Sequence, residues 1–121
     1  MTDRRQWCDA LFATIDSMDS RGFASFLTAD ASFRYGSAPP VINTAAIVQA
    51  LDAFFGSVAR VSHSLRDVWD VDGHVICRGE VRYTRHDGRT VSTLFCNVFT
   101  MRDEKIAHYD IYLDPTALFA R

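Results

Sequence analysis

The sequence predicts an α+β fold, a cone in which three N-terminal helices pack on the concave face of a curved, mainly antiparallel sheet. The first half of the chain carries apolar residues at helical spacing. The second half carries four long stretches rich in β-branched and aromatic residues, separated by short turn sequences. Helices followed by a meander of strands are typical of α+β folds, and a meander that long must twist and curl.

Length and composition restrict the class of protein. The 121 residues are expected to form one domain over 1–121, and a net charge of −2 argues against nucleic-acid binding. No apolar run is long enough to cross a membrane, and the N-terminus lacks the pattern of a signal peptide. Cys8, Cys77 and Cys96 share no metal-ligand spacing, so we expect reduced thiols in a cytoplasmic protein.

The first two helices are expected near the N-terminus. An apolar stripe runs from Trp7 to Met18 at helical spacing, and Thr2 or Asp3 can cap that helix. A second, shorter helix follows residues 19–20. Its apolar side consists of Phe23, Phe26 and Leu27.

A strand, a loop and the third helix come next. Residues 31–35 alternate as a strand, and the turn residues of 36–40 predict a loop. Asn43 or Thr44 can cap the third helix. The broad apolar face of that helix consists of Ile47, Val48, Leu51, Phe54, Phe55 and Val58.

Four strands complete the fold, and their turns predict which residues share a face. The strands are expected at Val61–Trp69, Val75–Tyr83, Val91–Met101 and Ile106–Leu113, separated by Asp72-Gly73, Asp87-Gly88 and Asp103-Glu104. With two-residue loops at the last two turns, a mostly apolar set faces the helices. That set is Cys77, Gly79, Val81, Tyr83, Leu94, Cys96, Val98, Tyr109, Ile111 and Leu113.

The opposite face combines aromatic and charged residues. It carries Arg78, Glu80, Arg82, Phe95, Asn97, Phe99, His108, Asp110 and Tyr112. Exposed aromatic residues ringed by charge are typical of an association surface. We therefore expect a homodimer through this face, around Arg78, Phe95, Asn97, Phe99, Asp110 and Tyr112.

The first hairpin has two possible registers. A two-residue Asp72-Gly73 turn places His63, Leu65, Asp67 and Trp69 on the outer face, whereas a three-residue Val71-Asp72-Gly73 loop turns them inward. We favour the three-residue loop, because the alternative inward set is a poor lining for a core. That alternative set is Ser62, Ser64, Arg66 and Val68.

His63 is the best candidate for proton transfer, since imidazole titrates near neutral pH. Asp67, on the same face, can orient it, and Tyr35, Tyr83 or Tyr109 can donate a hydrogen bond to a carbonyl or enolate oxygen. A structural, hydrogen-bonded histidine at a strand start is the alternative interpretation, and the tyrosines are equally ordinary as packing residues. Further pocket-lining residues are expected to be Phe33, Phe54, Trp69, Tyr83 and Tyr109.

No cofactor is expected. The four histidines share no ligand spacing, so the sequence predicts no metal site. It also contains no phosphate-binding glycine loop and no nucleophile elbow. The expected partner is a small hydrophobic molecule.

Three segments carry a resemblance to a known family. They are Asp87-Gly88-Arg89-Thr90-Val91, Asn97-Val98-Phe99 and Tyr109-Asp110-Ile111-Tyr112-Leu113-Asp114-Pro115, and the helix order and residues 33–40 fit as well. With these features the whole chain resembles the nuclear transport factor 2-like superfamily. Its SnoaL-like branch includes polyketide cyclases, limonene epoxide hydrolase and ketosteroid isomerase. The resemblance implies a cystatin-like cone with a pocket, frequent dimers and many chemistries.

The sequence departs from the epoxide hydrolase pattern. That pattern has an Arg-x-Asp pair before the Asp-Gly turn and another Asp in the last strand, which fall here at Gly79, Val81 and Ile111. The acidic network of the isomerase has no clear counterpart either. Three classes of function stay open: a cofactor-free acid–base enzyme (isomerase, cyclase, dehydratase or hydrolase), a non-catalytic ligand-binding domain, and an assembly subunit acting through the outer sheet face.

Overall fold

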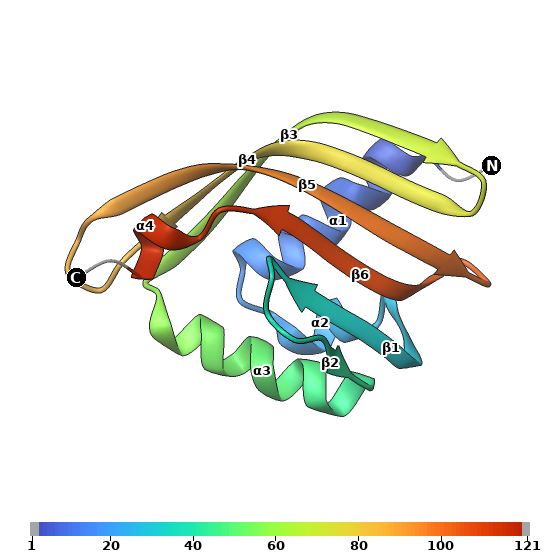
Figure 1. Ribbon diagram of the computed structural model, residues 1–121, viewed down its shortest axis with the longest axis horizontal. Coiled ribbons are helices and arrows are strands. Elements are labelled where there is room, and N and C mark those ends of the chain that lie inside the picture. Colours follow the sequence, from blue (N-terminus) through green and yellow to red (C-terminus); the bar gives the residue numbers. More distant parts are fainter. Residues whose placement is uncertain (1–2, 120–121) are drawn as a thin grey trace.

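The computed structural model describes residues 3–119, in which helices lie against one side of a curved six-stranded sheet (Figure 1). The helices are α1 (Arg4–Asp16), α2 (Ser20–Ala24), α3 (Thr44–Ser57) and α4 (Thr116–Phe119). The strands are β1 (Leu27–Tyr35), β2 (Val41–Ile42), β3 (Arg60–Val71), β4 (His74–Thr84), β5 (Thr90–Arg102) and β6 (Lys105–Leu113).

The strand order is β2-β1-β6-β5-β4-β3. Neighbouring strands are antiparallel except β1 and β6, which are parallel. The three N-terminal helices lie on the concave side of the sheet, so the predicted α+β cone is confirmed (Figure 1). Sequence patterns did not predict β2 and α4, which are only 2 and 4 residues long.

The caps of the two long helices follow from short polar side chains. Asp3 accepts two backbone N–H groups of the first turn of α1, and Thr2, the alternative cap, lies outside the described residues. Asn43, rather than Thr44, caps α3. Each cap satisfies donors that the first turn of a helix leaves unpaired.

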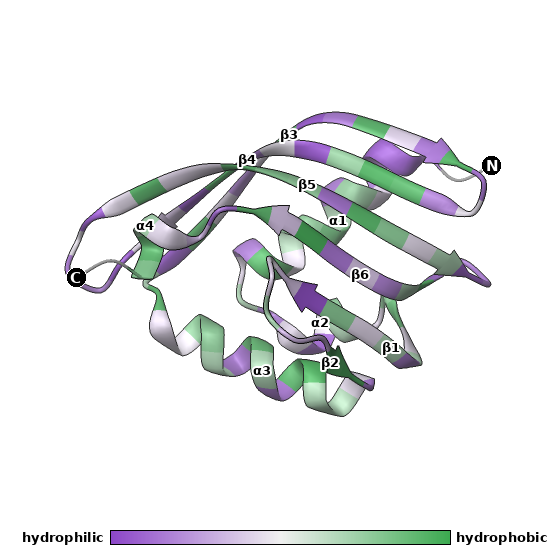
Figure 2. Ribbon diagram, viewed as in Figure 1, coloured by the Kyte–Doolittle hydropathy of each residue, from purple (hydrophilic) through white to green (hydrophobic). Residues whose placement is uncertain are grey.

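The core lies between the helices and the sheet. Leu11 of α1, Phe23 of α2 and Ile47 of α3 pack with Phe99 and Tyr109 of the sheet, and all five are almost fully buried. Hydrophobic positions recur on every long element, with hydrophilic positions between them (Figure 2). Within residues 3–119 no helix has the length and apolar character needed to span a membrane.

The first hairpin differs from the prediction. Val71 pairs with His74, so the turn has two residues, with φ of 50° at Asp72 and 79° at Gly73. The preferred three-residue loop was therefore wrong. As a result Asp67 and Trp69 face outward, and Trp69 is 43% exposed.

A β-bulge reverses the facing of β3 further along the strand. The register shifts between the pairs Leu65–Gly79 and Asp67–Arg78. One extra residue on a bulged strand moves the residues beyond it to the opposite face. His63 consequently pairs with the buried Val81 and faces the helices.

The second hairpin inverts the predicted faces of β5. The Arg85 N–H donates to the Arg89 carbonyl, and the three-residue loop between them has Gly88 at φ 88°. This register is one residue away from that of a two-residue loop. Leu94, Cys96 and Val98 therefore lie on the outer face. The inward residues are Phe95, Asn97 and Phe99, which are 4%, 2% and 0% exposed.

The third hairpin has the predicted two-residue turn, because Arg102 pairs with Lys105. A register shift then follows between Thr100 and Met101. This bulge compensates for the reversed facing of β5. Tyr109 of β6 therefore opposes Phe99 and faces inward as predicted. Bulges and loop length thus determine which side chains of β3 and β5 reach the interior.

Candidate functional site

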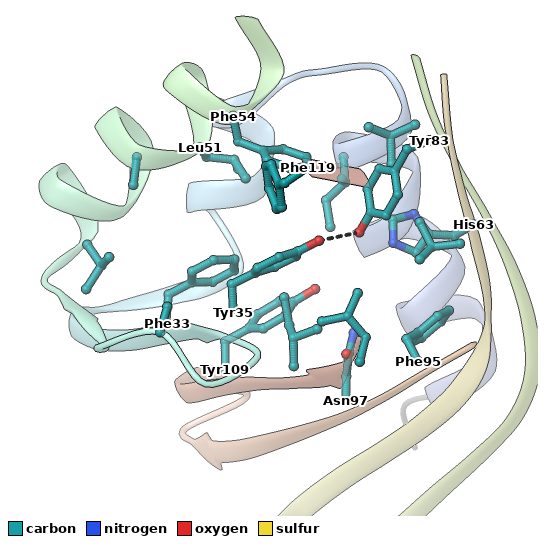
Figure 3. A pocket seen from close by; sticks show the side chains of 18 of the residues that line it. Phe33, Tyr35, Leu51, Phe54, His63, Tyr83, Phe95, Asn97, Tyr109 and Phe119 are labelled. Carbon is teal, nitrogen blue, oxygen red and sulfur yellow. Dashed lines mark hydrogen bonds between the residues drawn. The ribbon is translucent and has the colours of Figure 1, made fainter. Parts of the chain in front are cut away.

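A cavity of about 210 Å³ lies between α3, β1 and the concave side of the sheet (Figure 3). Its wall is mainly aromatic and aliphatic. The aromatic lining residues are Phe33, Tyr35, Phe54, Tyr83, Phe95, Tyr109 and Phe119. The other side chains that can bear hydrogen bonds there are His63 and Asn97. Few polar groups in an apolar cavity are typical of a small-molecule site.

His63 is held by Asp16, the last residue of α1. Asp16 Oδ1 lies 2.6 Å from His63 Nδ1, and its Oδ2 accepts the backbone N–H of His63 at 3.0 Å. An ionised carboxylate only accepts hydrogen bonds, so Nδ1 must carry the proton of this pair. Nε2 is then the nitrogen available to a ligand, and it has no hydrogen-bond partner among residues 3–119.

Two aromatic rings fix the plane of the imidazole. Phe12 stacks on the His63 ring at 4.5 Å between centroids and 22° between planes. Phe95 meets the same ring edge to face at 5.4 Å. The His63 side chain is only 11% exposed, whereas that of Asp16 is 29% exposed. A second group that orients a histidine in this way is typical of acid–base sites.

A pair of tyrosine hydroxyls lies on the same cavity. The hydroxyl oxygens of Tyr35 and Tyr83 are 3.0 Å apart, and either can be the donor (Figure 3). Burial raises the pKa of Tyr35 and of Tyr83 above the ordinary value near 10. Both hydroxyls therefore stay protonated at neutral pH, as hydrogen-bond donors to a ligand oxygen must be.

Most of the predicted pocket residues lie on the cavity, and two of the predicted site residues do not. Asp67 was expected beside His63, but it forms an ion pair with Arg78 on the outer face at 2.8 Å. Trp69 was expected in the pocket, but it lies outside with the Arg78 guanidinium 5.6 Å from its ring centroid. Both expectations depended on the three-residue turn of the first hairpin and are wrong for that reason.

Asp16 was not among the site residues predicted from the sequence. Its position contained a signal, because Asp16 lies four residues after Phe12 in α1 and therefore on the same side of the helix. Phe12 itself contacts His63. The contact between α1 and β3 spans 47 residues of sequence, and periodicity alone does not pair such distant elements.

Three of the six residues expected at a dimer interface face the interior. Phe99 belongs to the core, whereas Phe95 and Asn97 line the cavity, because the three-residue second hairpin turns β5 over. Arg78 and Tyr112 are exposed on the outer face, and Asp110 there is half-buried.

The sequence of this chain matches a known protein family. A profile of the SnoaL-like domain matches residues 8–109. The chain belongs to the SnoaL-like family. The predicted resemblance to the nuclear transport factor 2-like superfamily is thereby confirmed. No curated protein matches the sequence.

Solved structures share the fold of this SnoaL-like chain. An NTF2-like protein of unknown function from Burkholderia pseudomallei K96243 matches with a TM-score of 0.87 at 12% identity, over 98% of this chain and 95% of that one. TerC, co-crystallised with polyporic acid, matches with a TM-score of 0.79 at 22% identity, over 90% of this chain and 89% of TerC. A putative SnoaL-like polyketide cyclase from Jannaschia sp. CCS1 matches with a TM-score of 0.76 at 14% identity, over 98% of this chain and 94% of that one.

Besides its tyrosine hydroxyls, the SnoaL-like pocket of this chain has one ionisable pair, formed by His63 of β3 and Asp16 of α1. Gly79, Val81 and Ile111, where the epoxide hydrolase pattern has charged residues, carry no polar side-chain group. Val81 and Ile111 line the cavity. Among the described residues no cluster of three His, Cys, Asp or Glu could hold a metal ion. Acid–base chemistry in this cavity would therefore depend on the pair of His63 and Asp16.

Proposed function

We propose that this chain is a cofactor-free acid–base enzyme that acts on a small hydrophobic molecule. His63 serves as general acid or base, and Asp16 positions it. The observation that carries the proposal is the 2.6 Å hydrogen bond between His63 Nδ1 and Asp16, at the wall of an otherwise aromatic cavity. A histidine of this kind can serve isomerase, cyclase, dehydratase and hydrolase reactions alike.

The arrangement supports proton abstraction next to a carbonyl group. Nε2 of His63 would take a proton from the α-carbon, and the C–H electron pair would become the C=C bond of an enolate. The carbonyl π electrons move to oxygen, where a hydroxyl of Tyr35 or Tyr83 can donate a hydrogen bond. Return of the proton from His63 to another atom completes an isomerisation. If the proton on His63 is first replaced by a solvent deuteron, delivery to the same carbon completes an exchange.

The names of two structural neighbours agree with a small organic ligand. One is a putative SnoaL-like polyketide cyclase, and TerC was crystallised with polyporic acid. The identities of 14% and 22% limit this support to the kind of molecule that the fold accommodates. The free thiols of Cys8, Cys77 and Cys96 agree with the cytoplasm as the compartment that we propose.

A non-catalytic ligand-binding domain is the second candidate. The observation that favours it is the composition of the cavity wall, which is almost entirely apolar apart from His63, Asn97 and the tyrosine hydroxyls. Such a wall can bind a hydrophobic molecule without any proton transfer. Turnover therefore has to be measured separately from binding.

Deuterium exchange distinguishes the two candidates. The ketones 1-tetralone and 2-tetralone are incubated with protein in D₂O, and loss of the α-proton signals is followed by NMR. We expect exchange above the buffer rate, lowered roughly 10²–10⁴-fold in His63→Asn. His108→Asn, an exposed histidine that bonds Ser32 at 2.7 Å, is the control and keeps the rate. Equal exchange in His63→Asn, or none in the wild type, contradicts catalysis by His63.

We also propose that the chain forms a homodimer through the outer face of its sheet. Large apolar side chains are exposed there, with Leu94 at 63%, Tyr112 at 58% and Trp69 at 43%. The oppositely charged Arg78 and Asp67 accompany them. Such a mixture of aromatic, aliphatic and charged groups is typical of an association surface.

A further inference from the structure

Asn97 is a buried polar residue in an apolar stretch of β5. It is 2% exposed, and its inward neighbours on the same strand, Phe95 and Phe99, are 4% and 0% exposed. Its side chain lines the cavity (Figure 3), and its Oδ1 has no hydrogen-bond partner among residues 3–119. Buried side-chain oxygens are nearly always paired, so this oxygen reduces stability unless something else binds the amide.

Packing alone does not require an amide at this position. The residues paired with Asn97 in the neighbouring strands are Cys77 and Ile111, which offer apolar side chains. Leucine has the same number and branching of side-chain heavy atoms as asparagine, although its methyl groups make it larger, and it leaves no polar atom unpaired. A polar group kept at a cost to stability on the wall of a cavity is typical of a binding site.

The amide is well placed to bind a second group of a ligand that contacts His63. Phe95 precedes Asn97 by two residues on the same face and contacts the His63 ring. Successive inward residues of a strand are about 6.5–7 Å apart. The amide and the imidazole both line the cavity and have Phe95 as a common neighbour, so one ligand in the cavity can contact both.

We propose that Asn97 binds a hydroxyl group of the ligand, and that the ligands are compact ring compounds with that hydroxyl on one side. The orphaned oxygen needs a donor, and a hydroxyl can donate to Oδ1 and also accept from Nδ2. The cavity of about 210 Å³ is smaller than the 300–1,000 Å³ of pockets for drug-sized ligands. This proposal rests on the proposed function in one respect, namely that the reacting atom of the ligand lies against His63.

A matched pair of probes tests the hydroxyl. 2-Naphthol and 2-methylnaphthalene have almost the same shape and differ in one hydroxyl, and their dissociation constants are measured by NMR titration. We expect the wild type to bind 2-naphthol roughly tenfold or more tightly than 2-methylnaphthalene, because the latter leaves Oδ1 unpaired. Asn97→Leu removes or reverses this preference. Asn97→Val serves as the second apolar variant, since a β-branched residue suits a strand.

Melting temperature gives an independent readout. Asn97→Leu is expected to melt at a higher temperature than the wild type, whereas an asparagine with a structural hydrogen bond would lose stability on the same change. Retention of the 2-naphthol preference in both Asn97 variants overturns the proposal. Absence of the preference in the wild type, or of binding by either probe, overturns it as well.

His63→Gln separates this inference from the proposed function. If Asn97 binds the hydroxyl, His63→Gln keeps the 2-naphthol preference even though it loses tetralone exchange. If His63→Gln instead abolishes the preference and Asn97→Leu keeps it, the hydroxyl binds at His63 and the inference fails while the function stands. A wild type with the preference but without exchange loses the proposed function and keeps the binding role of Asn97.

Discussion

Gly79 of β4 lies directly against the carbonyl group of Ser64, at the bulge of β3. A Cβ atom on Gly79 would overlap the Ser64 carbonyl oxygen and come within 3.1 Å of the Leu65 Cα. The register shift of the β3–β4 ladder starts at the Leu65–Gly79 pair. This close backbone approach is open only to glycine, and it accompanies the bulge that turns His63 toward the cavity.

Gly79→Ala is therefore expected to destabilise the protein by about 1–3 kcal/mol, because backbone atoms must move apart. Urea denaturation followed by circular dichroism measures this. Gly56→Ala in α3 is the control, since a Cβ there meets nothing within 4 Å. That change should raise the free energy of unfolding by about 0.5–1 kcal/mol. A Gly79→Ala protein as stable as the wild type would show that the ladder at Leu65 adapts freely.

The long elements of the fold could be predicted from the sequence. Apolar spacing indicated the helices, and alternating strands separated by Asp-Gly or Asp-Glu turns indicated β3 to β6. The inward faces of β4 and β6 were also correct, as the burial of Val81 and Tyr109 demonstrates. These features depend on periodicity and turn chemistry, which are local properties of a sequence.

The register could not be predicted in the same way. The Asp87-Gly88 turn sequence suits both a two-residue loop and a three-residue loop with Gly88 in the left-handed conformation. The bulges of β3 and β6 have no clear sequence signal and depend on close contacts such as that of Gly79 with Ser64. His63 was predicted to face inward through a longer turn, whereas a bulge produces that orientation.

The buried tyrosines predict a loss of stability at alkaline pH. Burial raises the pKa of Tyr35 and Tyr83 above 10, and that of Tyr109 well above it. The folded state therefore favours the protonated hydroxyls. Their contribution to stability is complete below the unfolded value near 10, and it is lost as the pH rises from there toward the folded values.

Urea denaturation between pH 8 and 11 measures this loss. In Tyr83→Phe the free energy of unfolding should fall less steeply above pH 10, because one raised pKa is gone. At neutral pH the same variant loses about 1 kcal/mol with the hydrogen bond to Tyr35. If Tyr83→Phe leaves the pH dependence of the free energy of unfolding unchanged, the raised pKa of Tyr83 is contradicted.

The proposed homodimer predicts a dependence of assembly on Leu94. Leu94→Glu places a charge among exposed apolar groups of the outer sheet face, so it should shift the chain toward monomer. Sedimentation velocity over a range of concentrations measures the distribution. Gln49→Glu adds a charge on the exposed side of α3 and should leave assembly unchanged. A wild type that is monomeric at all concentrations would exclude the dimer.

The aspartate beside His63 is Asp16, not Asp67 as the sequence suggested. Asp16 hydrogen-bonds both the ring and the backbone of His63, whereas Asp67 pairs with Arg78 on the opposite face of the sheet. Asp16→Asn keeps the shape of the side chain but removes its charge. The neutral amide stabilises a protonated imidazole less than a carboxylate does, and it can impose the wrong tautomer on His63.

We therefore expect Asp16→Asn to lower the rate of tetralone exchange by at least tenfold, and Asp67→Asn to leave it unchanged. Thermal melting of both variants is the accompanying measurement. Asp67→Asn should cost at most about 1 kcal/mol, because its ion pair is exposed to solvent. Asp16→Asn should also retain the fold, since its side chain is 29% exposed. If Asp67→Asn reduces exchange and Asp16→Asn does not, the β3 register that directs His63 into the cavity is wrong.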